Sequence, residues 1–335
     1  MLVKLRHMAK RSVSGYAQFA VLLGALLVGS PDASASTTTV IGTLAERGQI
    51  AQHGGLVVVT QLDDEGTATM AIGSKLAAPR AIKTHRLPAW GQPHVGTSEL
   101  GSTVIVYPHC HDASLPRTCN LWAFDVTFGT DTELKGEASR SGTGEIEGDL
   151  DRGALAFVRW IAPKGRPDTL SLGGRADRNT QLFYAPFGGA ARTVAVPGGQ
   201  QIDLDRGRVA QVRDRDPLPA CDAPVVEVVT VATAAVATVA HHGCRHVAQK
   251  YLAPTLIASD VVWGLRTPTV SVVERVPARG GSSLGAEVVP FAALAPAGPD
   301  SAYELRGDTT PALGSEPARL TSTWTFAHSE GLVMH

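Results

Sequence analysis

The stretch Gly148 to Trp160, GDLDRGALAFVRW, joins a polar Asp-Leu-Asp-Arg-Gly turn to an apolar segment that runs from Ala154 to Trp160. The same pattern returns at Ile202 to Arg213 (IDLDRGRVAQVR) and, more loosely, at Ile257 to Arg266 (IASDVVWGLR). A glycine-containing turn followed by apolar and β-branched residues is typical of a buried strand. The recurrence therefore indicates a repeated β-architecture.

Similar apolar strands can be traced on both sides of this stretch. We expect six of them, at Leu56–Gln61, Thr103–Tyr107, Ala154–Trp160, Arg208–Arg213, Asp260–Leu265 and Ala302–Arg306. They lie about 50 residues apart, hairpins with glycine-containing turns follow most of them, and no segment has the sustained periodicity of a helix. This spacing predicts an all-β fold, a β-propeller of six four-stranded blades, with seven blades as the alternative.

A propeller has to close into a ring, because an open end would leave the edge of a sheet unpaired. We expect the tail segments Ser322–Phe326 and Gly331–Met334 to complete the last blade. The N-terminal strand Thr37–Leu44 is expected to pair at the same place.

The turn Asp149-Leu150-Asp151-Arg152-Gly153, followed by ALAFV, resembles the blades of TolB-type and related WD-repeat-like β-propellers of the exported bacterial type. In those blades an Asp-x-Gly turn joins the innermost strand to the next, and a later pair of strands completes the blade. Leu121–Asp125 with Gly129–Leu134 is similar to that later pair, as is Leu182–Tyr184 with Gly188–Val194. The resemblance covers residues 40–334. It implies a fold and often a binding role, but no fixed catalytic residues.

The first 35 residues have the organisation of an export signal. Four basic residues between Lys4 and Arg11 precede the apolar run Phe19–Val28, and Ala33-Ser34-Ala35 supplies a small-x-small cleavage pattern. We therefore expect cleavage after Ala35, a single propeller domain at residues 36–335, and a location in the secreted fraction or at the exterior of the cell envelope. An uncleaved N-terminal anchor is the alternative.

No stable membrane span is expected after cleavage, since the apolar run is shorter than the roughly 20 residues that a spanning helix needs. Val225–Ala240 is also apolar, but its Val and Thr residues favour two strands. The chain has 335 residues, 44% of them hydrophobic, and a formal net charge of -1. It lacks the concentrated basic face that nucleic acid requires. The expected partner is an unidentified protein or small ligand at a propeller face.

The four cysteines are expected to form two local disulfides, as an even number in an exported chain suggests. Cys110 and Cys119 bracket a short loop, and Cys221 and Cys244 lie symmetrically about a predicted turn near residues 232 and 233. The alternative is a metal site, for which the lower-ranked candidate ligands are His109, His111, His241, His242 and His246. Because two disulfides would account for every sulfur, we expect no metal and no cofactor.

Two carboxylate pairs, Asp149 with Asp151 and Asp203 with Asp205, are spaced by two residues. On a strand this spacing places both side chains on one face, where they could perform acid–base chemistry or hold Ca²⁺. Their recurrence at matching blade positions favours a turn role instead, in which the side chain accepts backbone N–H bonds.

The expected function is that of an exported, non-enzymatic binding or protein-interaction module. The alternative is a hydrolase or lyase acting on glycans or peptides at the propeller axis. Its catalytic residues are unknown, and the candidates are His53, His85, His94, His109 and Asp112. Convergence of these side chains at the axis would favour the enzyme, and dispersal would favour the binding module.

Overall fold

Antiparallel strands make up nearly all regular structure in the described part of the chain. The structure, a computed structural model, describes residues 37–44, 49–63, 67–74, 77–138, 143–161, 180–187, 189–194, 196–214, 224–241, 250–266, 271–282, 284–289, 292–298, 301–307 and 324–330. All of them belong to one compact unit, residues 36–335. The expected export signal at residues 1–35 lies outside the described residues.

The described strands form six antiparallel sheets that repeat one order of strands. The first strand of each sheet, called the inner strand below, is β2 (Ile50–His53), β7 (His94–Thr97), β11 (Gly144–Asp151), β15 (Gln200–Asp205), β19 (Lys250–Ile257) or β23 (Ala292–Gly298). The second is β3 (Leu56–Leu62), β8 (Thr103–Cys110), β12 (Ala154–Trp160), β16 (Arg208–Asp214), β20 (Asp260–Arg266) or β24 (Ser301–Gly307). The third is β4 (Thr67–Ser74), β9 (Cys119–Asp125), β13 (Thr180–Pro186), β17 (Pro224–Thr230), β21 (Ser271–Pro277) or β25 (Trp324–Glu330). The outer one is β5 (Ala77–Ala81), β10 (Thr130–Glu133), β14 (Arg192–Thr193), β18 (Ala235–His241), β22 (Gly285–Val289) or β1 (Thr37–Leu44).

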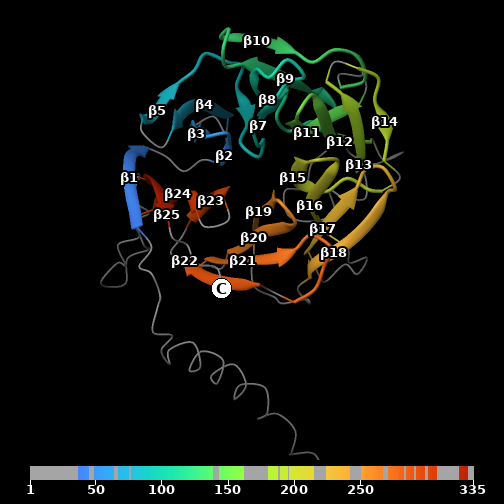
Figure 1. Ribbon diagram of the computed structural model, residues 1–335. Coiled ribbons are helices and arrows are strands. Elements are labelled where there is room, and N and C mark those ends of the chain that lie inside the picture. The colour runs from blue at the N-terminus through green and yellow to red at the C-terminus, as the bar shows by residue number, and fades with distance from the viewer. Residues whose placement is uncertain are drawn as a thin grey trace, which may run out of the picture. The chain divides into compact units, whose positions relative to one another are not determined.

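The inner strands contact one another around a closed circuit, as Figure 1 shows. In order, β2 contacts β7, then β11, β15, β19 and β23 come next, and β23 contacts β2. Apolar layers fill the space between neighbouring sheets; Val106 and Leu121 pack in this way with Leu150 and Phe157 of the next sheet. The expected all-β propeller is therefore confirmed.

The second strands match the six apolar strands expected from the sequence, with β12 identical to the expected Ala154–Trp160. β3, β8 and β12 are rich in Val, Leu or Ile because neighbouring sheets cover both of their faces. Val57, Val58 and Val59 of β3 are fully buried. Two short 3₁₀ helices, η1 (Pro116–Thr118) and η2 (Gly136–Ala138), are the helical turns of the described residues. Within that part of the chain, no helix has the length and apolar character needed to cross a membrane.

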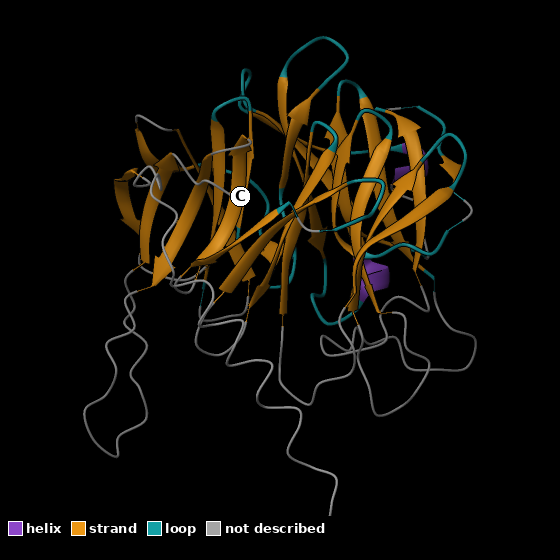
Figure 2. Ribbon diagram, turned by 60° about the horizontal axis from the view of Figure 1, so that its bottom comes forward, coloured by secondary structure: helices purple, strands orange, loops and turns teal. Residues whose placement is uncertain are grey.

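The Asp-Arg-Gly turns connect inner to second strands at one end of the sheets. Arg152 and Gly153 have φ values of 45° and 74°, and Arg206 and Gly207 have 50° and 72°. Two successive residues with positive φ are typical of the type I′ turn, which matches the twist of a two-residue hairpin. Figure 2 shows the described short turns gathered at one end of the strands.

The last sheet combines strands from the two ends of the described chain. β1 pairs with β25, with Thr37 opposite Glu330 and Leu44 opposite Trp324. This pairing confirms the expected role of the N-terminal strand in closing the ring. The described tail strand is Trp324–Glu330; Ser322, Thr323 and the expected Gly331–Met334 segment lie outside the described residues.

Candidate functional site

Four ionisable side chains gather on three neighbouring inner strands and are called the inner-strand cluster below. His94 comes from β7, Glu147 and Asp149 from β11, and Asp203 from β15. Glu147 and Asp149 share one face of β11, because side chains two residues apart on a strand point the same way. The repeated contact of inner strands around the ring therefore brings the four residues together.

The carboxylates of this cluster accept hydrogen bonds from the backbone of the next sheet. Glu147 accepts the N–H groups of Ile202 (2.7 Å) and Gln201 (2.8 Å), and Asp149 accepts that of Leu204 (2.5 Å). One repeat further on, Asp203 accepts the N–H of Leu256 at 2.7 Å. These carboxylates join one blade to the next.

Asp151 and the exposed Arg206 make a further bond of the same kind at the end of the strand. Asp151 Oδ2 accepts the N–H of Arg206 at 2.8 Å. The sequence predicts that Asp151 accepts a backbone N–H in its turn, and the structure supplies that N–H from the neighbouring sheet. The interpretation of the carboxylate pairs as turn residues is therefore incomplete, since they also hold adjacent sheets together.

His94 is enclosed by two of these carboxylates. Its Nε2 lies 3.2 Å from Glu147 Oε1, and its Nδ1 lies 3.8 Å from Asp149 Oδ1. The three side chains are only 5–8% exposed. Burial opposes a charged imidazole, but the negative charges of Asp149 and Glu147 outweigh it and raise the pKa of His94.

Two carboxyl groups in the cluster, those of Asp149 and Asp203, hold their protons more tightly than usual. Burial raises the pKa of Asp149, although His94 and the N–H groups of Leu204 and Leu150 oppose the rise. Burial, and then the negative charge of Asp149, raise the pKa of Asp203 to about 8. Two neighbouring carboxyl groups cannot both ionise readily, so a proton bound to one of them is stabilised by the negative charge of the other. The cluster can therefore take up and release a proton inside the ring.

The structure does not bring the five candidates for an axial enzyme site together. His94 belongs to the inner-strand cluster, and His53, on β2, lies near enough for its charge to lower the pKa of Asp149. His85 and His109 lie side by side elsewhere, with ring centroids 4.9 Å apart, where the sheet of β2–β6 (β6, Leu87–Pro88, pairs with β4) meets the sheet of β7–β10. Asp112 is exposed in the loop between β8 and β9.

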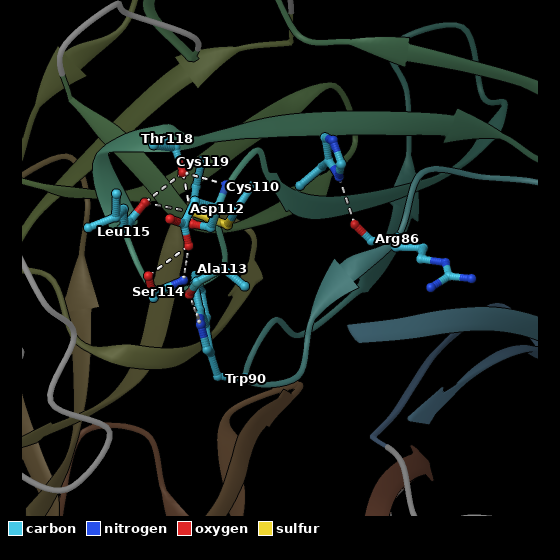
Figure 3. Close-up of a disulfide and its surroundings, with 10 residues drawn as sticks. Arg86, Trp90, Cys110, Asp112, Ala113, Ser114, Leu115, Thr118 and Cys119 are labelled. Atoms are coloured by element: carbon cyan, nitrogen blue, oxygen red, sulfur yellow. Dashed lines mark hydrogen bonds between the residues drawn. A yellow bond between two sulfur atoms is a disulfide. The ribbon is translucent and has the colours of Figure 1, made fainter. Parts of the chain in front are cut away.

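That loop is closed by a disulfide between Cys110 and Cys119, with an S–S distance of 2.03 Å. Figure 3 shows how its residues bond to one another and to the preceding segment. Asp112 Oδ1 accepts the N–H (2.9 Å) and the hydroxyl (2.7 Å) of Ser114, while Trp90 Nε1 donates to the carbonyl of Ala113 at 3.1 Å. The disulfide loop is thus ordered by local polar bonds.

The other expected disulfide, Cys221 with Cys244, lies outside the described residues, as do His242, His246 and the side chain of His241. His111 is exposed in the disulfide loop. No group of three or more His, Cys, Asp or Glu side chains in the described part of the chain is arranged to hold a metal ion.

Glu147 is the cluster member that the sequence interpretation misses. A signal for it exists: Glu145, Glu147, Asp149 and Asp151 alternate with other residues through the whole inner strand. Such alternation of acidic side chains in a segment that leads into a buried strand indicates a shared polar face.

Scans against protein-family models and against curated proteins found no match. Among solved structures, TolB from Acinetobacter baumannii is 12% identical, with 72% of this chain and 53% of that chain covered and a TM-score of 0.47. A putative TolB from Agrobacterium tumefaciens is 16% identical, with coverage of 57% and 63% and a TM-score of 0.35. The chain therefore spans 53% and 63% of the length of these two proteins.

An oligogalacturonate lyase from Vibrio parahaemolyticus is 12% identical, with 84% of this chain and 80% of that chain covered and a TM-score of 0.51. At these identities the likeness concerns the fold. The structural neighbours of the chain thus include TolB-like β-propellers, and its own sheets have the propeller arrangement.

Proposed function

We propose that this protein is an exported, non-enzymatic binding or protein-interaction module built on six four-stranded blades. The blade number is supported by the repeated order of inner, second, third and outer strands in the described sheets. A seventh blade would require β1 to belong to a sheet of its own, whereas it pairs with β25.

The observation that carries the proposal is the use of the inner-strand carboxylates. Glu147, Asp149 and Asp203 each accept backbone N–H groups from the next sheet, so the polar groups nearest the axis hold the ring together. His94, more than nine-tenths buried among them, is shielded from a bulky substrate. A scaffold with a rigid centre presents its turns as the recognition surface.

The turns at the Asp-Arg-Gly end carry exposed apolar side chains that suit such a role. Leu100, between β7 and β8, is 94% exposed, and Phe128, between β9 and β10, is 74% exposed. Val236 and Leu284 are also exposed next to turns at this end. A protein partner bound at this end would remove the apolar surface of these side chains from water.

Site-specific crosslinking in the producing cell tests the proposal. A photoreactive phenylalanine analogue at Phe128 or Leu100 should give one discrete adduct of higher mass. The matched control is Ile161, an exposed apolar residue that comes directly after β12 at the opposite end of the strands and is 43% exposed. Adducts at Ile161 as abundant as those at Phe128, or none at Phe128, would contradict a contact at the Asp-Arg-Gly end.

Export is tested separately by the intact mass of the protein recovered outside the cytoplasmic membrane. We expect a mature chain that begins at Ser36 and whose cysteines resist alkylation until they are reduced. A mass that retains residues 1–35 would indicate the uncleaved anchor.

A hydrolase or lyase acting on glycans or peptides at the axis is the second candidate, and the acidic surroundings of His94 are what favour it. If it is correct, His94→Gln should abolish turnover of oligosaccharide or peptide substrates, while His111→Gln, at an exposed histidine of the disulfide loop, should retain turnover and serves as the control. Equal turnover in both variants would remove this candidate.

A further inference from the structure

Two imidazole rings meet at the junction between two sheets, away from the inner-strand cluster. His85 lies in the segment between β5 and β6, and His109 lies near the end of β8. Their ring centroids are 4.9 Å apart and their planes are inclined by 53°. They are at the opposite end of β8 from Leu100, so a ligand bound at these rings would not depend on the proposed interaction surface.

The Nδ1 atom of each ring is held by an acceptor. His85 Nδ1 lies 2.9 Å from Asp131 Oδ2, and His109 Nδ1 lies 2.7 Å from the carbonyl oxygen of Arg86. A carbonyl oxygen can only accept, so His109 carries its proton on Nδ1, and the carboxylate favours the same tautomer of His85. The neutral rings therefore keep the lone pair on Nε2.

Asp131 is itself fixed, which makes the orientation of His85 firm. The hydroxyl of Tyr107 donates to Asp131 at 2.6 Å, and the backbone N–H of His85 donates to the same carboxylate at 2.9 Å. A histidine whose Nδ1–H is bonded to a carboxylate or a backbone carbonyl, and whose partner is bonded in turn, is the usual arrangement behind a metal ligand.

The indole ring of Trp122 contacts both imidazole rings. Its ring centroid lies 3.8 Å from that of His85 and 5.8 Å from that of His109. The side chain of His85 is 45% exposed, so an ion can reach it from solvent. Neither Nε2 has a hydrogen-bond partner among the described residues.

The geometry points to a site for a divalent first-row transition-metal ion, ligated by Nε2 of His85 and Nε2 of His109. At the usual metal–nitrogen distance of about 2.0–2.1 Å, two imidazoles bound to one ion have centroids roughly 4.5–5.2 Å apart, which includes the observed 4.9 Å. No third protein ligand is arranged around them in the described part of the chain, so water completes the coordination. Imidazole ligands suit Cu²⁺, Ni²⁺ and Zn²⁺, and Cu²⁺ binds most tightly.

This pair differs from the ligand sets that the sequence suggests. There His109 is a candidate ligand together with the neighbouring His111, whereas the structure places it beside His85. Two strands, β6 and β7, separate His85 from His109 in the sequence, and the packing of the two sheets brings the rings together.

The test is a titration of the full chain with Cu²⁺, monitored by tryptophan fluorescence and by electron paramagnetic resonance. Binding of one ion should quench the emission of Trp122 and give a spectrum with two coordinated nitrogens. His85→Gln and His109→Gln should each weaken binding by about tenfold or more. The matched controls His111→Gln and His53→Gln should bind like the parent protein, and Trp122→Phe should bind while losing the quenching.

A second measurement needs no variant, in case a substitution disturbs the sheet junction. Diethyl pyrocarbonate modifies accessible neutral imidazoles, and peptide masses report each histidine separately. Zn²⁺ should slow the modification of His85 and His109 and leave that of His111 unchanged. Unaltered Cu²⁺ binding in both Gln variants, or a lack of protection by Zn²⁺ at His85 and His109, would overturn the site.

Discussion

Asp149 and Asp203 have the same structural role on successive inner strands, although the charged groups near them differ. Each accepts a backbone N–H from the following inner strand, 55 or 53 residues further along the chain. A buried carboxylate needs such donors, because leaving it without partners in a place with little water is costly. The ring therefore depends on the acceptor geometry of these side chains.

Asp149→Asn should lower the free energy of unfolding by about 1–3 kcal/mol. The amide nitrogen would face an N–H donor of Leu204 or Leu150, and His94 would lose one of its negative neighbours. Urea unfolding monitored by circular dichroism measures the change. Glu99→Gln, at an exposed carboxylate in the turn before β8, is the control, and an equal effect of the two substitutions would contradict this role of Asp149.

Stability should fall as pH rises between about 4 and 8, with Asp203 as one cause. Its pKa is about 8 in the folded protein against a reference of 3.8, so the folded state binds more protons in this window and loses that advantage as pH increases. The raised pKa of His94 acts in the same direction above its reference of 6.5. In Asp203→Asn, the melting temperature should vary less with pH.

Glu99→Gln, at an exposed carboxylate in the turn before β8, is also the control for that comparison. It should keep the pH dependence of the parent protein. A slope in Asp203→Asn as steep as in the parent would exclude Asp203 as its source.

The sequence predicts part of this chemistry. The spacing of Asp149 from Asp151 correctly places both on one face of a strand, and the repeat correctly marks them as structural. Their partners, the N–H groups of Leu204 and Arg206, lie on another sheet, and local spacing holds no information on which backbone groups will face them. The clustering of His94 with Glu147 depends on the same packing of sheets.

The hairpin of β8 and β9 is stabilised in two independent ways, by strand pairing and by a disulfide. Cys110 and Cys119 are directly opposite each other in the strand pairing, and the disulfide joins them across it. The bond also closes the loop that carries Asp112 and Ser114. Because the strands are already paired along their length, the disulfide acts mainly on the unfolded chain.

The double variant Cys110→Ala/Cys119→Ala should lose about 2–4 kcal/mol of stability, in keeping with the loss of one loop closure. The fold should persist, since the strand pairing is retained. Denaturant unfolding of the variant and of the parent gives the difference. Reducing the parent protein should move its curve toward that of the variant, and an unchanged midpoint in both cases would contradict the stabilising role.

The existence of each strand is predicted well from the sequence, whereas the residues at which the strand ends are predicted less well. Ala154–Trp160 is identical to β12, because a strand covered on both faces needs a continuous apolar run. The expected strand Thr103–Tyr107 continues to Cys110 in β8, and the expected Leu56–Gln61 continues to Leu62 in β3. Outer strands and loop starts are set by tertiary contacts more than by their own residues.

At the scale of the whole molecule, the contacts between neighbouring sheets hold the ring together. Gly96 shows how close these junctions are: a Cβ atom there would overlap the carbonyl oxygen of Leu150 on the next inner strand. The junction between β1 and β25 differs from the others, because it lies within one sheet and joins distant parts of the chain.

Deletion of residues 37–44 should destabilise the entire ring. The edge of β25 would lose its partner, and an unpaired edge strand invites association with other chains. We expect a lower melting temperature and a shift to larger species in size-exclusion chromatography. Deletion of residues 1–35 is the control and should leave both properties unchanged; similar behaviour of the two deletions would show that β1 does not close the ring.

The pairing of Thr37 with Glu330 also determines when the last sheet can be completed during folding. β1 precedes every other described strand in the chain, whereas its partner β25 is the last described strand, so the two can pair only when nearly the whole chain is available. The preceding sheets can form in order from local hairpins, but the final step joins segments of very large sequence separation and is intrinsically slow. Until then β1 is an unpaired strand in solution, so assistance from chaperones should matter most for its eight residues.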